Sequence, residues 1–237
     1  MRRLLIADVH ANLPALDAVL RDAGPVDEVL FLGDIVGYGP HPAQCVDLLQ
    51  RLGALAVAGN HDREVLQRRL LEAPCEPVTW LRWTAGRLTD AHLAYIAGLP
   101  RERRISTGIG EILALHHPSG APYLHPDMPD AELARYFAAA SAPIVLLGHS
   151  HRLIDRLVGG RRLVCLPAVG QPRDGDPRAG YALESGGELS FHRVEYDVES
   201  VVADVREIGL DATFTARWVA FMRTAFDPEW SRPYRRG

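Results

Sequence analysis

Lysine is absent from this sequence of 237 residues, and all 26 of its Lys or Arg positions are arginine. A chain without an ε-amine cannot form a Schiff base with a substrate or with pyridoxal phosphate. It also cannot build the phosphate-binding loop that ends in Gly-Lys-Ser or Gly-Lys-Thr. The missing residue therefore excludes several large classes of enzyme.

Cysteine is scarce, with only Cys45, Cys75 and Cys165, which are far apart and form no C-x-x-C pair. An odd number of distant cysteines indicates neither a disulfide framework nor a thiolate zinc site. We expect them to be small buried residues.

Long apolar runs are also lacking. The first one, residues 4–7, stops at Asp8, which is too short for a signal-peptide core, and no run approaches the ~20 residues of a membrane span. Net charge is -4, so the overall positive charge that attracts nucleic acid is missing as well. We expect a cytoplasmic protein that binds neither a membrane nor nucleic acid.

The length and the hydrophobic fraction of 47% are typical of one globular domain, and no linker divides the chain, so we expect a single domain over 1–237. Its first part reads as βαβαβ, with Asn12 capping the first helix and Gly24 ending it, and so predicts a parallel sheet. The expected strands are 3–7, 29–32 and 55–58, and the expected helices are 13–24 and 41–52.

A helical insert is expected at about 63–98, where Trp80 and Trp83 favour core packing over base stacking. Short strands and a helix at 130–140 follow, and then a helical extension at about 198–226. The apolar faces of that extension are expected to cover either the sheet edge or a second copy of the chain in a homo-oligomer.

Five apolar runs each end in residues that can bind a metal ion. The runs are LLIADVH, VLFLGD, ALAVAGNHD, EILALHH and IVLLGHSH. The carboxyl ends of strands in an open α/β sheet converge on one crevice, and mixed oxygen and nitrogen donors suit two divalent ions. The side chains expected to meet there are Asp8, His10, Asp34, Asn60, His116, His149 and His151.

Four of these side chains form two pairs, and the members of each pair are two residues apart in the sequence. The pairs are Asp8 with His10 and His149 with His151. In an extended strand such residues point to the same side, so each pair could share one ion. Taken alone, each pair fits a polar strand end or a surface pair as well. Gly33 lets the chain turn sharply before Asp34.

Together, the order D-x-H, G-D, G-N-H-D, H, G-H-x-H over residues 5–151 resembles the calcineurin-like metallophosphoesterase superfamily. The segments ADVHANLPALDAVL, LGDIVGYGP and VGQPRDGDPRAGYA are similar to its small bacterial branch of phosphodiesterases and diadenosine tetraphosphatase relatives. The resemblance implies an α/β fold in which two mixed β-sheets pack face to face between helices. It also implies phosphate ester hydrolysis by in-line attack of a hydroxide held by two metal ions.

The resemblance also assigns roles to individual residues. Asp34 would bridge the ions, and His61 would be the catalytic imidazole that protonates the leaving group. The first ion would be held by Asp8, His10, Asp34 and His151, and the second by Asp34, Asn60, His116 and His149.

Three segments depart from the pattern. In HHPSG, a second histidine follows His116, so His117 could be the ligand instead or could contact the substrate. In CLPAVGQPRD, the residues before GQPRD differ from the Asn-Pro-Gly-Ser that relatives usually have there. GDIVGYG lacks both the Asp partner of the catalytic histidine and the phosphate-binding Arg of phosphoprotein phosphatases, which disfavours a protein phosphatase. Arg173 and Arg178 either bind a second phosphate or nucleotide, or are solvated loop charges.

We therefore expect a metal-dependent phosphodiesterase that acts on a small molecule or nucleotide, with Mn²⁺ favoured over iron, zinc or nickel. A phosphomonoesterase, a dinucleoside polyphosphate hydrolase and a non-catalytic scaffold of the same fold are the alternatives.

Overall fold

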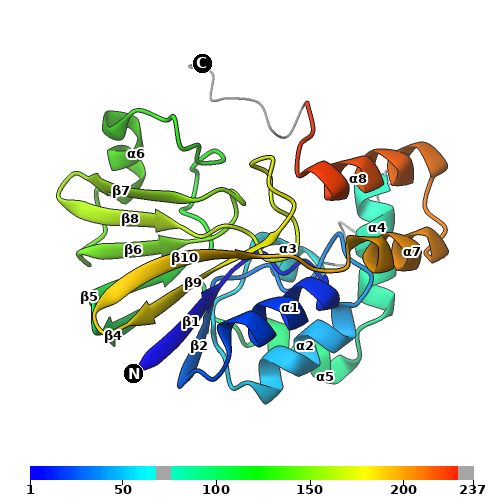
Figure 1. Ribbon diagram of the computed structural model, residues 1–237, viewed down its shortest axis with the longest axis horizontal. Helices are drawn as coiled ribbons and strands as arrows, with labels where there is room; N and C mark the ends of the chain where they lie inside the picture. The colour runs from blue at the N-terminus through cyan, green and yellow to red at the C-terminus, as the bar shows by residue number, and fades with distance from the viewer. Residues whose placement is uncertain (68–75, 229–237) are drawn as a thin grey trace.

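The computed structural model describes residues 1–67 and 76–228 (Figure 1). Its strands form two five-stranded sheets, in the orders β10-β9-β1-β2-β3 and β4-β5-β6-β8-β7. The sheets lie face to face with helices outside them, so the predicted fold class is confirmed.

The first sheet is parallel in its amino-terminal part, as predicted, and mixed as a whole. The parallel strands are β1 (Arg2–Ile6), β2 (Glu28–Phe31) and β3 (Leu55–Ala56). The hairpin of β9 (Ala179–Ser185) and β10 (Glu188–Val194) adds to β1 in the antiparallel direction. Its turn consists of Gly186 and Gly187, whose positive φ angles of 62° and 83° suit a tight two-residue connection.

The second sheet is also mixed. Its strands are β4 (Glu102–Thr107), β5 (Gly110–Leu115), β6 (Ile144–Leu147), β7 (Ile154–Val158) and β8 (Arg161–Cys165). β5, β6 and β8 run parallel, while β4 and β7 pair antiparallel at the two edges. The carboxyl ends of β5 and β6 therefore lie at the same edge of this sheet.

Residues that alternate along the strands fill the space between the sheets. Leu5 and Leu30 of the first sheet pack against Ile112 and Leu146 of the second. Because successive side chains of a strand point to opposite faces, the intervening residues Leu4 and Phe31 face the helices. One layer of buried side chains thus lies between the two sheets, and another lies between the first sheet and its helices.

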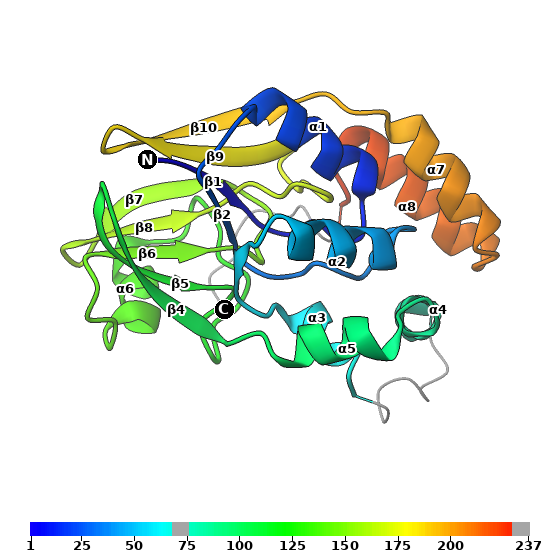
Figure 2. The ribbon, with the colours of Figure 1, turned by 90° about the horizontal axis from the view of Figure 1, so that it is seen from below.

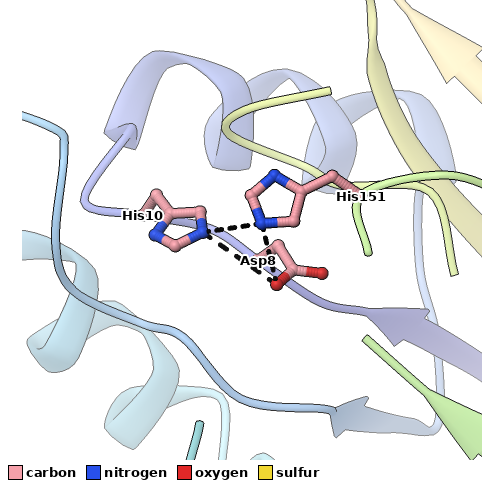
Figure 3. Close-up of side chains that lie close together, drawn as sticks. All are labelled: Asp8, His10 and His151. Atoms are coloured by element: carbon pink, nitrogen blue, oxygen red, sulfur yellow. Dashed lines mark hydrogen bonds and ion pairs between the residues drawn. The ribbon is translucent and has the colours of Figure 1, made fainter. Parts of the chain in front are cut away.

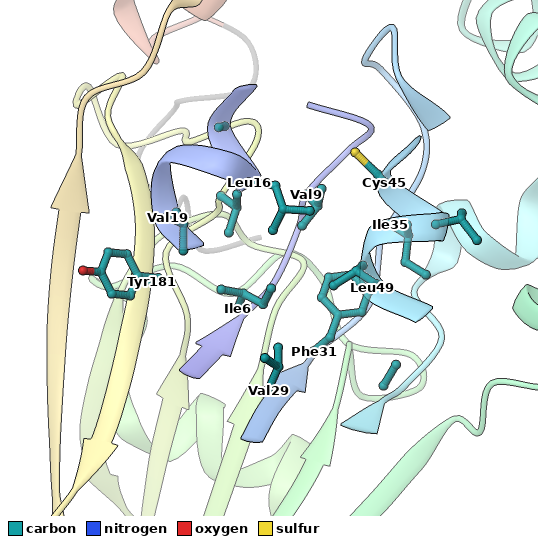
Figure 4. Packing of buried hydrophobic residues seen from close by; sticks show 14 of the residues in the cluster. Ile6, Val9, Leu16, Val19, Val29, Phe31, Ile35, Cys45, Leu49 and Tyr181 are labelled. Atoms are coloured by element: carbon teal, nitrogen blue, oxygen red, sulfur yellow. The ribbon is translucent and has the colours of Figure 1, made fainter. Parts of the chain in front are cut away.

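Helices α1 (Leu13–Ala23), α2 (Pro42–Arg51) and α5 (Asp90–Ala97) pack on the outer side of the first sheet (Figures 2 and 4). The Asn12 side chain accepts a hydrogen bond from the Ala15 N–H and caps α1, and Gly24 ends it at a φ of 63°, both as predicted. Helix α6 (Asp130–Phe137) packs on the second sheet.

The carboxyl-terminal helices α7 (Val198–Glu207) and α8 (Ala212–Thr224) pack against α4 (Glu76–Gly86). Trp80 of α4 is 1% exposed and lies 5.2 Å, between ring centres, from Trp218 of α8. These apolar faces thus pack against a helix of the expected insert, an arrangement beside the two that the sequence suggested, the sheet edge and a second copy of the chain. Core packing is confirmed for Trp80.

Cys45 and Cys165 are buried, as expected, while Cys75 lies outside the described residues. Within 1–67 and 76–228 there is no helix with both the length and the apolar character needed to cross a bilayer.

Candidate metal centre

The predicted metal-binding side chains come together at the carboxyl-terminal ends of β1, β2, β3, β5 and β6. With His61, the predicted catalytic residue, they form three overlapping groups, and within each group the donor atoms lie within 4.8 Å of one another. The first group is Asp8, His10 and His151, the second is Asp34, His116 and His149, and the third, His10, Asp34 and His61, overlaps the other two. Asn60 joins the second group through its side-chain oxygen.

The first group is formed by the loops after β1 and β6 (Figure 3). The Nε2 atoms of His10 and His151 are 3.1 Å apart, and His151 Nε2 lies 3.4 Å from Asp8 Oδ1. His10 and Asp8 are 1% and 0% exposed. Two imidazole nitrogens and a carboxylate oxygen thus face one another in a buried space.

The second group lies beside the first, and its Asp34 also approaches His10 of the first group. Asp34 Oδ2 is 3.2 Å from His116 Nε2 and 3.7 Å from His10 Nε2, so this carboxylate lies between the two groups. Asn60 Oδ1 is 2.9 Å from His149 Nδ1 and 3.3 Å from His116 Nε2. The Asn60 amide nitrogen donates to Glu64 at 3.4 Å, which turns the amide oxygen toward the histidines.

Backbone carbonyls set the tautomers of three of these histidines. The Nδ1 atoms of His10, His116 and His151 lie 3.3, 2.6 and 2.5 Å from the carbonyl oxygens of Val36, Leu32 and Gln171. Because a carbonyl oxygen can only accept, each Nδ1 donates its hydrogen, and Nε2 is the ring atom that points into the cluster. Ring nitrogens and carboxylate oxygens that face one another in this way fit divalent cations.

The backbone brings the paired residues together in a way that the sequence did not predict. β1 ends at Ile6 and β6 at Leu147, so neither pair continues an extended strand. Asp8 and His10 have φ angles of 55° and 47°, and His149 and His151 have 69° and 58°. The explanation from strand periodicity was therefore wrong, because left-handed residues in the loops orient these side chains. Such strain is typical of functional sites.

Asp62 holds the loop that carries Asp34. Its buried carboxylate accepts backbone hydrogen bonds from Asp34 at 2.8 Å, Ile35 at 2.8 Å, Val36 at 3.3 Å and Gly59 at 2.9 Å. Each unpaired buried amide would cost about 1–3 kcal/mol, so this one side chain offsets strain in the loop, where Asp34 has a φ of 60°. Sequence reasoning missed the role of Asp62, although it is the last letter of GNHD.

Two glycines are required where these loops meet. A Cβ atom on Gly59 would lie 2.0 Å from Asp34 Oδ1 and 2.3 Å from Asp34 N. Gly33 has a φ of 91°, which confirms the sharp turn predicted before Asp34. The close contact at Gly59 therefore permits no side chain without displacing the Asp34 carboxylate.

Burial and mutual charge shift the pKa values within the cluster. Burial raises the pKa of Asp8 to about 7 and lowers the pKa of His10 to about 3. Burial also acts to lower the pKa of His116, but the Asp34 carboxylate outweighs it and the pKa rises to about 9. Protons therefore compete with cations for these atoms, and metal affinity should increase as the pH rises.

His61 lies in α3 (Asn60–Glu64), beside the metal-binding cluster and partly exposed. Its ring centre is 5.1 Å from that of His10 and 4.6 Å from that of Tyr38. Its Nδ1 atom is 3.4 Å from Glu64 Oε2. Sequence reasoning missed Glu64 and noted only that the Asp partner of phosphoprotein phosphatases is absent. The spacing of three residues in a short helix was the available signal.

His117 is separate from the donor cluster. Its ring centre is 4.1 Å from that of His149, and its Nε2 atom lies 3.2 Å from the Pro122 carbonyl oxygen. His116, by contrast, faces Asp34. Of the two, His116 belongs to a group of donor atoms that could hold a metal ion, and His117 lies at the border of that group.

The two candidate arginines differ in position. Arg173 is 7% exposed, and its guanidinium carbon lies 5.4 Å from the ring centre of Tyr123, which stacks on His149 at 4.4 Å. Arg178 forms an ion pair of 2.7 Å with Asp176 in an exposed loop. Of the two readings, substrate binding fits the position of Arg173, and a solvated loop charge fits Arg178.

Comparison with known proteins agrees with this geometry. Residues 1–153 match the family model of the calcineurin-like phosphoesterases. An uncharacterised protein of Methanocaldococcus jannaschii is 31% identical over 219 residues, which cover 82% of this chain and 88% of that protein.

Solved structures are similar over nearly the whole chain. The crystal structure of a metallophosphoesterase from Sphaerobacter thermophilus is 37% identical, with a TM-score of 0.75 over 93% of this chain and 98% of that one. A hypothetical protein from Pyrococcus horikoshii, 20% identical, has the same fold with a TM-score of 0.82 over 94% and 98% of the two chains. The chain therefore belongs to the calcineurin-like phosphoesterase family and is a metal-dependent phosphoesterase.

Proposed function

We propose that this protein hydrolyses phosphodiester bonds in a small-molecule or nucleotide substrate with the help of two divalent metal ions. The observation that supports this most strongly is the position of Asp34. Its Oδ2 atom lies 3.7 Å from a histidine of the first donor group and 3.2 Å from one of the second. A carboxylate shared by two adjacent groups of buried donors suits a pair of cations better than one.

Every predicted ligand takes part in the proposed assignment. Asp8, His10, Asp34 and His151 would hold the first ion, and Asp34, Asn60, His116 and His149 the second. The ions would activate water at neutral pH and neutralise the oxygens of the reacting phosphate. Mixed imidazole and oxygen donors suit Mn²⁺, our first choice, and also iron, zinc or nickel.

His61 would protonate the oxygen of the leaving group. Its imidazole borders the cluster without being enclosed by it, and Glu64 lies 3.4 Å from Nδ1. A carboxylate at that atom fixes the orientation of the ring, so that Nε2 can face the substrate for proton transfer. Glu64 thus acts as a positioning residue in this proposal.

Arg173 and His117 would contact the substrate rather than the ions. Arg173 is buried next to Tyr123 and His149, where its guanidinium can bind a phosphoryl oxygen. A diester carries one negative charge and a monoester carries up to two. The Arg of phosphoprotein phosphatases is absent from GDIVGYG, so the lower charge of a diester suits the site better.

The proposal is tested with bis(4-nitrophenyl) phosphate and 4-nitrophenyl phosphate after the protein has been stripped with a chelator and supplied with Mn²⁺, iron, zinc or nickel. We expect no turnover by the stripped protein, recovery with metal, and a higher kcat/KM for the diester. A higher kcat/KM for the monoester would make the protein a phosphomonoesterase. Bound metal without turnover of either ester would favour the non-catalytic scaffold.

A further inference from the structure

Tyr38 lies beside the proposed general acid, in a strained turn of the loop after β2. The backbone of Tyr38 has a φ of 63°, and that of the preceding Gly37 has a φ of 92°. Left-handed backbone is uncommon for a residue as large as tyrosine and persists only where the surrounding structure holds it. The turn therefore fixes the position from which the Tyr38 side chain extends.

The ring of Tyr38 packs against two histidines of the site. Its centre lies 4.6 Å from that of His61, with the ring planes at 65°, and 5.2 Å from that of His10, with the planes at 63°. The rings of His10 and His61 are themselves 5.1 Å apart. Edge-to-face contacts of this kind are a preferred arrangement of aromatic rings, so the three rings hold one another in place.

The glycines on both sides of Tyr38 bring the backbone close to the same part of the site. A Cβ atom on Gly37 would lie 3.0 Å from Nδ1 and 3.1 Å from Cγ of His61. A Cβ atom on Gly39 would lie 2.1 Å from the carbonyl oxygen of His10. The three residues Gly-Tyr-Gly thus fit closely between the loop of His10 and the short helix α3 that carries His61.

Tyr38 is held in turn by the helices of the insert and of the carboxyl terminus. Its ring centre lies 6.2 Å from that of Trp80 of α4, with the planes at 79°. Trp80 is almost fully buried and packs against Trp218 of α8. A side chain enclosed in a packed core has little freedom to move, so Trp80 limits the movement of the Tyr38 ring. Contacts therefore run from α8 through Trp80 and Tyr38 to His61.

We propose that Tyr38 is a positioning residue for His61, whose imidazole it holds by ring packing in the orientation needed to protonate the leaving group. The inference rests on the role of His61 in the proposed function and adds a residue to it. Glu64 approaches one atom of the imidazole, Nδ1, whereas Tyr38 packs against the ring itself. The contacts of Tyr38 with His10, His61 and Trp80 are all made by its ring, so a phenylalanine should replace it.

The test compares Tyr38→Leu and Tyr38→Phe with the wild-type protein, all loaded with Mn²⁺, on two diesters. Diphenyl phosphate has a poorer leaving group than bis(4-nitrophenyl) phosphate and therefore depends more on proton donation. We expect Tyr38→Leu to lose about 10–100-fold in kcat on diphenyl phosphate and less than about threefold on the nitrophenyl ester, because a small misplacement of a catalytic group is costly. Tyr38→Phe should restore kcat on both esters, and both variants should bind as much metal as the wild type.

A double-mutant cycle separates positioning of His61 from a general effect on the fold. If Tyr38 acts through His61, adding Tyr38→Leu to His61→Ala should change kcat by less than about twofold on either ester. Tyr136→Leu is the matched control, because Tyr136 is a partly buried tyrosine of α6, which packs on the second sheet. If Tyr38→Leu does not fold, Gly37→Ala takes its place, since the added Cβ would displace the His61 ring.

The inference would be overturned by unchanged kcat of Tyr38→Leu on diphenyl phosphate, by an equal loss on both esters, or by a further loss in the His61→Ala background. Loss of metal from Tyr38→Leu would overturn it as well, because Tyr38 would then act on His10. A loss in Tyr38→Phe as large as in Tyr38→Leu would assign the role to the hydroxyl and not to ring packing. A wild-type protein that cleaves only the nitrophenyl ester would show that no proton donor assists the leaving group, which also overturns the inference. Failure of the wild-type protein on both diesters would instead overturn the proposed function.

Discussion

The Asp34→Asn variant is expected to lose both metal ions and, with them, hydrolysis. Its Oδ2 atom lies between His10 and His116, so the substitution replaces the negative charge shared by the two donor groups with a neutral amide. Changes to groups that only orient a ligand already lower metal affinity about 10–100-fold, so loss of a shared ligand should cost more than about 100-fold. Metal analysis after gel filtration measures this directly.

Asn has nearly the size of Asp, and its side-chain oxygen can still accept the 2.9 Å hydrogen bond from the His61 backbone N–H. The fold should therefore survive, which a thermal unfolding curve will check. Asp155→Asn is a suitable control because Asp155 is an exposed residue of β7 that forms an ion pair with Arg162 of β8, away from the donor groups. If Asp34→Asn retains two ions per chain, Asp34 does not bridge them.

The His61→Ala variant is expected to retain its metal and to lose about 10²–10⁴-fold in kcat, the usual contribution of a general acid. The loss should be greatest for an alkyl diester, whose poor leaving group needs a proton, and smaller for a nitrophenyl ester. The measurement is kcat on both ester types with metal content determined on the same sample. This dependence on the leaving group distinguishes proton donation from a structural role.

His192→Ala provides the control, because His192 of β10 lies outside the donor groups and stacks on Tyr181 of β9, with the ring centres 5.0 Å apart. Unchanged turnover of an alkyl diester by His61→Ala would contradict the proposed role. Loss of metal from this variant would show instead that His61 is a ligand, which its position near His10 and Asp34 would permit.

The sequence was sufficient to predict that these side chains meet. Each candidate follows an apolar run, and the carboxyl ends of neighbouring parallel strands must lie at one edge of their sheet. It did not reveal the route of the backbone. Whether Asp8 continues a strand or adopts a φ of 55° depends on hydrogen bonds such as that from its N–H to Gly33 O, which form only between loops distant in sequence.

The residues that sequence reasoning missed act through the tertiary structure. Asp62 matters because the loops after β2 and β3 approach each other and present four amides to its carboxylate. This arrangement depends on loops that are distant in the sequence.

The carboxyl-terminal helices illustrate the same limit. Their apolar periodicity predicted correctly that each buries one face, but periodicity does not identify the partner. The structure shows Trp218 against Trp80, two residues of different helices that are far apart in the chain. A sheet edge and a helix offer similar apolar surfaces, so the sequence alone did not distinguish them.

The number of metal ions bound per chain tests the central claim most directly. Wild-type protein should be stripped with a chelator, titrated with Mn²⁺ by calorimetry, and then analysed for metal after removal of the free ion. We predict two Mn²⁺ ions per chain, held by the donor groups that share Asp34. The proposed two-metal site would be contradicted if the protein bound one Mn²⁺ ion or none and also bound fewer than two ions of iron, zinc or nickel.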